Sequence, residues 1–155
     1  MADGEDQKVI ATNRKALFNY EILERAEAGL RLVGTEVKSI REGGLNFRDS
    51  FVEFRNGEMF LVGARIGPYS HGNIQNHAEG RDRKLLLHKQ EIRKLGAKVN
   101  ERGFTIVPLR AYFDKGRVKL EIGLARGKKA HDKREAIKKK DQEREARQAM
   151  SRKDR

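Results

Sequence analysis

Apolar and polar side chains alternate along much of the first 125 positions, which is the pattern of half-buried β-strands. Residues 19–25 show this alternation first, and Leu30 and Leu32 resume it after 27–29, where a glycine and a charged residue favour a turn. We therefore expect a hairpin here. A short helix should follow over 36–42, because two apolar residues lie three apart on one face and two glycines come directly after it.

The dipeptide Asn56-Gly57 is the clearest turn signal, since both residues tolerate the positive φ angles of a two-residue hairpin. It predicts an antiparallel pair of strands over 49–55 and 60–66. Residues 67–83 show little periodicity and contain Gly, Pro, Asn and two His. We expect a long loop there, and loops of this length in compact domains often have a functional role.

After this loop we expect a helix over 84–96, which has apolar residues along one face and Gly96 as its end. A strand over 104–113 should place its odd-numbered residues on one face. Pro108 cannot donate a backbone hydrogen bond, so it marks an edge or a bulge of that strand. The last strand, 118–124, alternates most regularly, and its opposite face is charged.

These elements predict a mainly β fold, an OB-like barrel of six antiparallel strands with short flanking helices. An unrelated α+β sandwich is the alternative. With 155 residues the chain is long enough for one domain. We expect a flexible N-terminal lead over 1–12, the barrel over 13–127 and a C-terminal tail over 128–155.

The tail differs from the barrel in composition. Residues 126–155 contain thirteen Lys and Arg against six Asp and Glu, a balance of +7 within a total net charge of +12. Because the tail has few sizeable apolar side chains, it cannot bury enough surface to offset its ordering entropy. Its charge spacing nevertheless suits a helix, with Asp132 as the N-cap. We expect a basic tail that is disordered when free and helical when bound.

The basic excess makes nucleic acid the leading partner, since each Lys or Arg that pairs with a phosphate releases a counterion. An acidic membrane surface is the alternative. No apolar run approaches the roughly 20 residues that span a bilayer. The acidic N-terminus lacks the apolar segment of a signal peptide, and the chain has no cysteine. These features favour a cytoplasmic protein without a membrane partner.

Motifs for catalysis or cofactor binding are few. Residues 123–129 resemble a phosphate-binding loop, but three rather than four residues separate the glycines, and Lys129 stands where Ser or Thr is required. His88 and Glu91 lie three apart on an expected helix, a spacing that is more often a surface contact than an acid–base pair. The four histidines lack the spacing of metal ligands. We expect no enzyme activity, no metal and no cofactor.

Three blocks of sequence resemble the signature segments of the bacterial SsrA-binding protein family, also called small protein B or SmpB. They are GTEVKSIR at 34–41, RKLLLHK at 83–89, and GLARGKK at 123–129 followed by DKR at 132–134. The resemblance implies an OB-like barrel that binds the tRNA-like domain of transfer-messenger RNA (tmRNA). It also implies support of alanylation by alanyl-tRNA synthetase, and delivery with elongation factor Tu to the A site of stalled ribosomes in trans-translation.

The same resemblance implies site residues. Asn13, Glu27 and Leu86 match positions of the family's RNA-facing surface, and the tail is implied to lie in the empty mRNA channel beyond the decoding centre of the small subunit. The residues expected to bind RNA are Asn13, Arg14, Lys15, Glu27, Lys38, Arg41, Lys84, Leu86, Arg126, Lys128 and Lys129. Those expected at the decoding centre and in the mRNA channel are His131, Asp132, Lys133, Arg134, Ile137 and Lys138.

Two other functions are alternatives. A generic ribosomal or RNA-chaperone OB-fold protein would use the same basic tail to bind RNA without specificity. A small hydrolase would use His88 and Glu91 as its acid–base pair.

Overall fold

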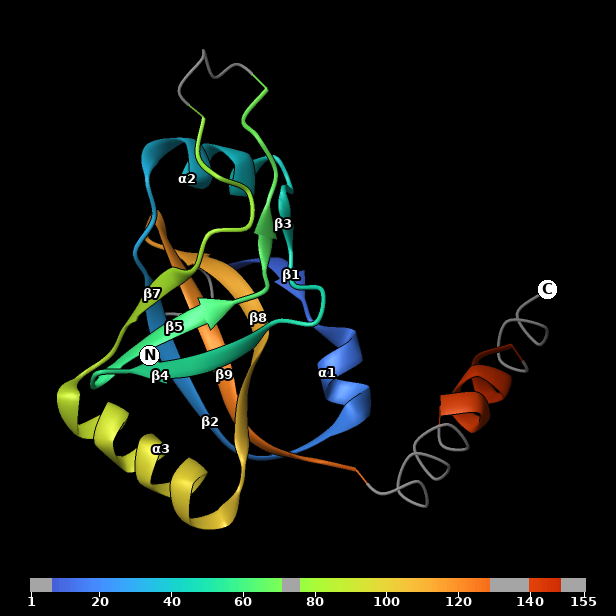
Figure 1. Cartoon of the computed structure of the whole chain (residues 1–155). Coiled ribbons are helices and arrows are strands. Elements are labelled where there is room, and N and C mark those ends of the chain that lie inside the picture. The colour runs from blue at the N-terminus through green and yellow to red at the C-terminus, as the bar shows by residue number, and fades with distance from the viewer. Residues whose placement is uncertain (1–6, 71–75, 129–139, 149–155) are drawn as a thin grey trace.

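The antiparallel strands of the computed structural model, which describes residues 7–70, 76–128 and 140–148, close into a barrel (Figure 1). One sheet has the strand order β1-β8-β4-β5-β7-β2-β9, and pairing of β8 with β9 closes it into a ring of six strands, with β1 added at β8. The strands are β1 (Gln7–Thr12), β2 (Tyr20–Leu30), β3 (Leu45–Asn46), β4 (Phe51–Arg55), β5 (Glu58–Val62), β6 (Arg65–Ile66), β7 (Arg83–Leu86), β8 (Thr105–Asp114) and β9 (Arg117–Gly127). The helices are α1 (Arg14–Asn19), α2 (Gly34–Arg41) and α3 (Lys89–Arg102).

The predicted fold class is confirmed: the protein is mainly β, with six antiparallel strands in a closed ring and short flanking helices. The membership of the ring differs from the prediction in two places. The expected hairpin over 19–32 is one strand, and the sixth place in the ring belongs to β7, which the sequence pattern assigns to a helix.

β2 continues through the residues where the sequence predicts a turn. Ala28, in the middle of that expected turn, is only 1% exposed and belongs to the barrel core. Gly29 allows β2 and β7 to approach closely, because a Cβ atom at this position would stand only 3.3 Å from the Cβ of Leu86 on β7. β2 therefore changes partner at this glycine, from β9 to β7.

The first part of the helix predicted over 84–96 is the strand β7, so that prediction is wrong. The side chains of Arg83 and Leu85 are buried and that of Leu86 is exposed, which is the alternation of a strand. β7 pairs with β5 on one side and with β2 on the other. Cross-strand pairing therefore decides the conformation of this leucine-rich run, which local propensity leaves ambiguous.

Helix α3 begins later and ends later than the sequence predicts. Gly96, expected as the helix end, lies inside α3, where the ring of Phe54 would stand 3.5 Å from an added Cβ. The helix ends instead at Gly103, whose φ of 68° is the left-handed conformation of a helix C-terminus. The distance from Gly96 to Phe54 is an ordinary van der Waals distance, so α3 packs on β4 at Gly96 with room for a Cβ atom.

β8 has a bulge at Pro108, as the proline predicts. Before the bulge, Ile106 belongs to the barrel core and Val107 to a second cluster with α1; the bulged residue Leu109 also packs in that second cluster. After the bulge, Ala111 belongs to the barrel core. The prediction that the odd-numbered residues of this strand share one face is therefore wrong, because the extra residue shifts the alternation.

The sequence does not predict two elements near the N-terminus. Gln7–Thr12, expected as part of a flexible lead, is the strand β1, which pairs with β8. The residues after it form α1, because Asn13 caps this helix: its Oδ1 accepts a hydrogen bond from the N–H of Ala16 (3.2 Å). β1 and α1 thus belong to the folded barrel.

The two longer helices cover opposite ends of the barrel (Figure 1). Ile40 of α2 and Leu95 of α3 both belong to the main core. The predicted helix over 36–42 is confirmed as α2, and the hairpin turn is confirmed at Asn56 and Gly57, whose φ angles are 49° and 77°.

In the tail, residues 140–148 are helical, and Arg144 donates to the carboxylate of Asp141 (3.0 Å). The expected N-cap Asp132 lies outside the described residues. Ordering of the tail only on a partner therefore stays a prediction. No helix within the described ranges is long and apolar enough to cross a membrane.

Candidate nucleic-acid interface

A hollow of about 640 Å³ lies where β2, β7 and β9 meet the start of α3, and we call it the β7 hollow. It brings together Glu27 and Leu86, which are far apart in the sequence. Leu86 is 50% exposed although it is a large apolar side chain. In this hollow the exposed leucine lies beside charged groups, so a base or a ribose could pack on it while polar contacts form around it. The hollow is lined by Arg25, Ala26, Glu27, Gly29, Leu86, Leu87, His88, Glu91 and Lys119.

Glu27 is held by a buried tyrosine. The hydroxyl of Tyr112 donates a hydrogen bond to Oε2 of Glu27, and the guanidinium of Arg110 lies 4.8 Å from the centre of the tyrosine ring. Burial, and then the contact with Glu27, raise the pKa of Tyr112 well above its usual value. The hydroxyl therefore stays protonated and keeps donating, so the exposed Glu27 carboxylate has a fixed direction.

A second carboxylate lies next to Glu27. Glu121 of β9 stands opposite Glu27 in the strand register. It accepts hydrogen bonds from Arg25 (2.7 Å) and from Arg110 (3.1 Å). These cations offset the repulsion that two facing carboxylates would otherwise create. The β7 hollow thus offers an acceptor, an apolar side chain and cations together, a set that suits bases and ribose hydroxyls as well as phosphates.

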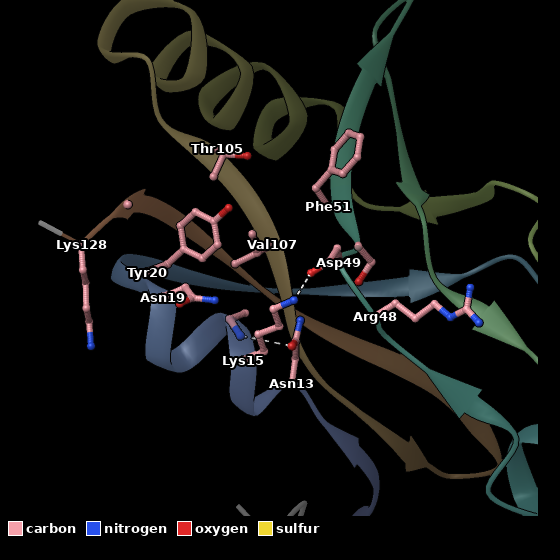
Figure 2. Close-up of a pocket in the computed structure, with 13 residues that line it drawn as sticks. Asn13, Lys15, Asn19, Tyr20, Arg48, Asp49, Phe51, Thr105, Val107 and Lys128 are labelled. Atoms are coloured by element: carbon pink, nitrogen blue, oxygen red, sulfur yellow. Dashed lines mark hydrogen bonds and ion pairs between the residues drawn. The ribbon is translucent and has the colours of Figure 1, made fainter. Parts of the chain in front are cut away.

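A second hollow, of about 460 Å³, lies between α1, the loop before β4 and the end of β9, and we call it the α1 hollow (Figure 2). It brings together Asn13, Lys15 and Lys128. Asn13 is buried; its Nδ2 donates to the carbonyl of Pro108 (2.8 Å) while its Oδ1 caps α1. Both ends of this amide are therefore engaged inside the protein, and Asn13 positions α1.

The other two predicted residues of the α1 hollow differ in accessibility. Lys15 is exposed and forms an ion pair with Asp49. Lys128 is half-buried, and its backbone N–H donates to the carbonyl of Asn19 (3.0 Å). This bond fixes the point at which the chain leaves the barrel toward the tail. Phe51, which also lines the hollow, is 41% exposed.

Lys38 and Arg41 project from α2, away from both hollows' lining. The Lys38 ammonium lies 5.5 Å from the ring centre of Tyr69, and the Arg41 guanidinium lies 5.7 Å from that of Phe113. Both cations are exposed and are oriented by aromatic rings.

The remaining predicted residues are dispersed. Lys84 pairs with Glu58 (3.1 Å), Arg126 pairs with Glu21 (2.7 Å), and Arg14 is exposed on α1. The structure thus groups part of the predicted set and separates the rest. The predicted residues that lie outside the described ranges are Lys129, His131, Asp132, Lys133, Arg134, Ile137 and Lys138.

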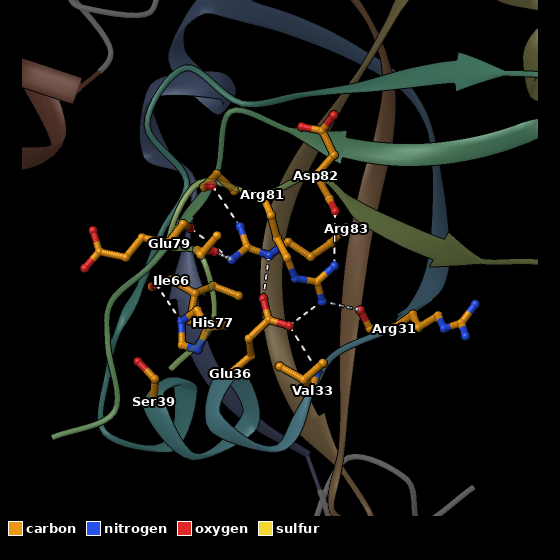
Figure 3. A network of polar contacts seen from close by, with 12 residues as sticks. Arg31, Val33, Glu36, Ser39, Ile66, His77, Glu79, Arg81, Asp82 and Arg83 are labelled. Atoms are coloured by element: carbon orange, nitrogen blue, oxygen red, sulfur yellow. Dashed lines mark hydrogen bonds and ion pairs between the residues drawn. The ribbon is translucent and has the colours of Figure 1, made fainter. Parts of the chain in front are cut away.

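The sequence interpretation missed a buried ion pair that joins α2 to β7 (Figure 3). Glu36 and Arg83 are both fully buried, and Nε of Arg83 donates to Oε2 of Glu36 (2.7 Å). The remaining guanidinium nitrogens of Arg83 donate to the carbonyls of Ala64, Ala78 and Glu79 at 3.1, 3.2 and 2.9 Å. Arg83 therefore fixes β7 to the loop before it and to α2.

Glu36 is charged despite its burial. Burial by itself raises the pKa of a carboxyl, but hydrogen bonds from Arg81, the N–H of Val33 (3.0 Å) and Arg83 outweigh it, so the pKa of Glu36 is lowered. A Glu at the third position of a helix can be read from the sequence as an N-terminal cap. The burial of Arg83 could not be read, because it depends on β7 being a strand.

The candidate hydrolase pair lies in the β7 hollow, which is lined by both His88 and Glu91. Within the described ranges, no group of three or more His, Asp or Glu side chains could hold a metal ion. His77 joins α2 to the neighbouring loop: its Nε2 donates to the carbonyl of Ile66 (2.9 Å), and its Nδ1 lies 2.9 Å from the hydroxyl of Thr35.

Comparison with known proteins identifies the family. The model of the family described as SmpB protein matches residues 10–152. An SsrA-binding protein of Geobacter metallireducens is 56% identical over 144 residues, which cover 93% of this chain and 94% of that protein. An SsrA-binding protein of Thermosynechococcus vestitus is 55% identical over 148 residues, covering 95% and 97%.

A solved structure supports the same assignment. The structure described as "tmRNA-SmpB: a journey to the center of the bacterial ribosome" superposes with a TM-score of 0.67 at 50% identity, covering 83% of this chain and 94% of that chain. The similarity includes the barrel and most of the tail in sequence, and the fold in space. The chain therefore belongs to the SmpB protein family.

Proposed function

We propose that this protein binds the tRNA-like domain of tmRNA and accompanies it to ribosomes stalled in translation, as a non-enzymatic factor of trans-translation. The observation that carries the proposal is the extent of similarity to proteins named SsrA-binding protein, which covers 95% of this chain for one relative. Barrel and tail are thus both shared. In addition, the solved neighbour is a tmRNA–SmpB structure that concerns the ribosome.

The β7 hollow is the surface that we assign to the tRNA-like RNA. Leu86 would pack on a base or a ribose, and the fixed carboxylate of Glu27 would accept hydrogen bonds from base amino groups or 2′-hydroxyls. Cations around the hollow would add phosphate contacts without reading sequence. The resulting recognition depends on the shape of the RNA, which suits a tRNA-like fold.

We assign the α1 hollow and the tail to the ribosome. Lys128 lies where the chain leaves the barrel, so the tail starts beside this hollow. The basic segment with Lys129 and His131 would meet the decoding centre of the small subunit, and the helix-forming segment after it would occupy the empty mRNA channel. The remaining expected tail contacts are Asp132, Lys133, Arg134, Ile137 and Lys138.

The proposal contains no catalytic step and no cofactor. His88 and Glu91 serve in it as walls of the β7 hollow. Alanyl-tRNA synthetase and elongation factor Tu are partners through the RNA, and the place of action is the cytoplasm. If His88→Ala abolished turnover of a substrate by this protein, the hydrolase alternative would replace the proposal.

A competition assay tests specificity against the generic RNA-chaperone alternative. The protein is offered a tRNA-like domain RNA and an unrelated duplex RNA at near-physiological salt. We expect preference for the tRNA-like RNA, because the β7 hollow adds contacts that phosphate pairing lacks. Equal affinities with equally steep salt dependence would leave only counterion release and would contradict the proposal.

Deletion of residues 132–155 tests the division of labour between barrel and tail. The shortened protein should fold and bind the isolated tRNA-like RNA, while rescue of stalled ribosomes in a purified translation system should fail. Rescue by the shortened protein would contradict the channel role of the tail. Loss of binding to the isolated RNA would contradict the assignment of that RNA to the barrel.

A further inference from the structure

Three hollows on the barrel adjoin one another and share walls. The β7 hollow shares Gly29, Leu86 and Lys119 with a hollow of about 410 Å³ beside Val37 of α2. The hollow beside Val37 in turn shares Gly116 with another hollow of about 410 Å³, which lies at Arg41 and β1. The three hollows therefore lie in a row, which we call the depression; it starts at the β7 hollow, passes the β8–β9 turn and ends at β1. We call its part from Lys119 onward the α2 track.

The α2 track is lined by cations and apolar groups. Its cations are Lys119, Arg117, Arg41 and Lys8. The described residues that line its two hollows include no Asp or Glu, whereas the β7 hollow contains Glu27 and Glu91. The charge of the depression therefore changes along its length, from mixed at the β7 hollow to purely positive along the track.

These cations are also available, in contrast to many others of the barrel. Arg25, Arg55 and Lys98, for example, each form an ion pair with a carboxylate. Among the described residues, Arg117, Lys119 and Lys8 have no carboxylate partner, and Arg41 has only the ring of Phe113. A cation without a carboxylate partner can bind a phosphate without first breaking an ion pair.

Apolar and aromatic groups lie between the cations. Val9 is 51% exposed in the far hollow, and the half-buried ring of Phe113 lies beneath the Arg41 guanidinium. Alternation of cations with apolar side chains along a groove suits the sugar–phosphate backbone of a nucleic acid, in which charged phosphates alternate with less polar riboses. An acidic protein partner would instead need hydrogen-bond donors and acceptors matched to its backbone.

We propose that the α2 track binds the backbone of the RNA whose base or ribose contacts Leu86, so that this RNA continues past Lys119 and Arg117 to Arg41 and Lys8. The inference rests on the proposed function, because it takes the β7 hollow as the RNA site. It adds a second contact of different chemistry: recognition in the β7 hollow and phosphate pairing along the track.

Salt dependence of binding tests the track. The double variants Arg117→Gln/Lys119→Gln and Lys8→Gln/Arg41→Gln are titrated with the tRNA-like domain RNA at several salt concentrations. Each variant should reduce the slope of log K against log salt by about two, since each lost phosphate contact removes about one. The control Arg55→Gln/Lys98→Gln removes the same charge from cations that already have carboxylate partners, and its slope should stay unchanged.

Cleavage of the bound RNA by a reagent attached to the protein tests independently whether the RNA lies along the α2 track. Because the chain has no cysteine, Val9→Cys provides a single attachment site for a cleavage reagent. We expect cuts in the bound RNA from this position and none from Glu101→Cys on α3.

The outcomes separate the track from the proposed function. If Leu86→Ala weakens binding while the track variants keep the full slope, or lose no more than the control loses, the track is wrong and the β7 hollow stands. A track that faces a protein would give this same result. If Leu86→Ala also leaves binding unchanged and the RNA competes no better than a duplex, both the track and the proposed function are wrong.

Discussion

The family resemblance assigns Glu27 and Leu86 of the β7 hollow and Asn13 of the α1 hollow to the same RNA-facing surface. The two hollows nevertheless differ in whether these side chains are exposed or buried. In the β7 hollow, Leu86 is half exposed and the Glu27 carboxylate is exposed while a buried tyrosine holds it. In the α1 hollow, Asn13 is buried and both ends of its amide bond to the protein itself. The residues assigned to RNA binding thus include contacting residues, whose side chains are open to RNA, and supporting residues, whose side chains hold the protein fold.

The comparison leads to an expected separation of two measured quantities. Substitutions of residues that support the fold, such as Arg83 and Asn13, should lower the free energy of unfolding and affect RNA only through folding. Substitutions of contacting residues should lower RNA affinity and leave unfolding almost unchanged. The following changes test this separation, from the largest expected effect to the smallest.

Arg83→Met should have the largest effect, because it removes the fully buried cation of Glu36 and leaves the half-buried Arg81 as its remaining partner. We expect a loss of about 3–5 kcal/mol in the free energy of unfolding, measured by urea denaturation. The exposed ion pairs of Arg55 provide the control, and Arg55→Met should leave the free energy of unfolding almost unchanged. A similar small loss for both variants would mean that the β7 hollow has no buried support.

Acid should weaken the same network. The pKa of Glu36 is lowered in the folded protein, so its contribution is complete above the unfolded value of about 4.3 and is lost as pH falls through the folded pKa. Between pH 6 and pH 3 the stability advantage of the wild type over Glu36→Gln should therefore shrink. Parallel stability curves for the two proteins would show that Glu36 does not titrate in this way.

Asn13→Ala should lower the free energy of unfolding by about 1–2 kcal/mol, since it removes a helix cap and a buried hydrogen bond. RNA affinity, measured where the variant is fully folded, should change less than about threefold, or roughly 0.6 kcal/mol. Asn19→Ala, in the same hollow, is the control and should stay within about 0.5 kcal/mol of wild type. A large loss of RNA affinity with unchanged stability would make Asn13 a contacting residue.

Leu86→Ala should behave in the opposite way. Burial of half a leucine side chain against RNA corresponds to about 1 kcal/mol, so affinity for the tRNA-like RNA should fall about fivefold. Stability should change by less than about 0.5 kcal/mol, because the side chain is exposed in the free protein. Leu23→Ala, at an exposed leucine of β2 outside the hollow, should change neither quantity. A large loss of stability with unchanged RNA affinity would make Leu86 a supporting residue and would contradict the distinction between the two hollows.

Tyr112→Phe should give the smallest change and shows how the β7 hollow is supported. Loss of one hydrogen bond to Glu27, worth about 1 kcal/mol at most, should lower RNA affinity about threefold. The same substitution in a Glu27→Ala background should have no further effect on affinity, because the tyrosine acts through that carboxylate. Additive losses would show that the tyrosine acts on RNA by another route.

Much of the barrel could be predicted because alternation reports directly on burial. β4 and β9 agree with their patterns, and the Asn56-Gly57 turn is where the dipeptide predicts it. The strand predicted over 60–66 is divided at Gly63 into β5 and β6, and β5 buries Met59 and Leu61 rather than Phe60 and Val62. Two other failures share one cause. Residues 27–29 have a local preference for a turn, but pairing of β2 with β9 and β7 outweighs it. Residues 83–86 have a local preference for a helix, but pairing of β7 with β5 and β2 outweighs it.

The candidate site divides along the same line. The blocks at 34–41, 83–89 and 123–129 carry the family resemblance, and with it Glu27 and Leu86, without any knowledge of space. Which of the predicted residues face one another could not be read, because strand register decides it. The Tyr112–Glu27 contact and the buried Arg83 both depend on that register.

The sequence by itself determined the fold class, the basic balance of the tail and the family of this protein, because hydrophobic periodicity, charge and motif spacing are local properties. Only the tertiary structure decided that Gly29 lets two strands approach, that β7 completes the ring, and that Asn13 supports while Leu86 is exposed. These facts arise from contacts between segments distant in the chain, whose energies no local pattern records.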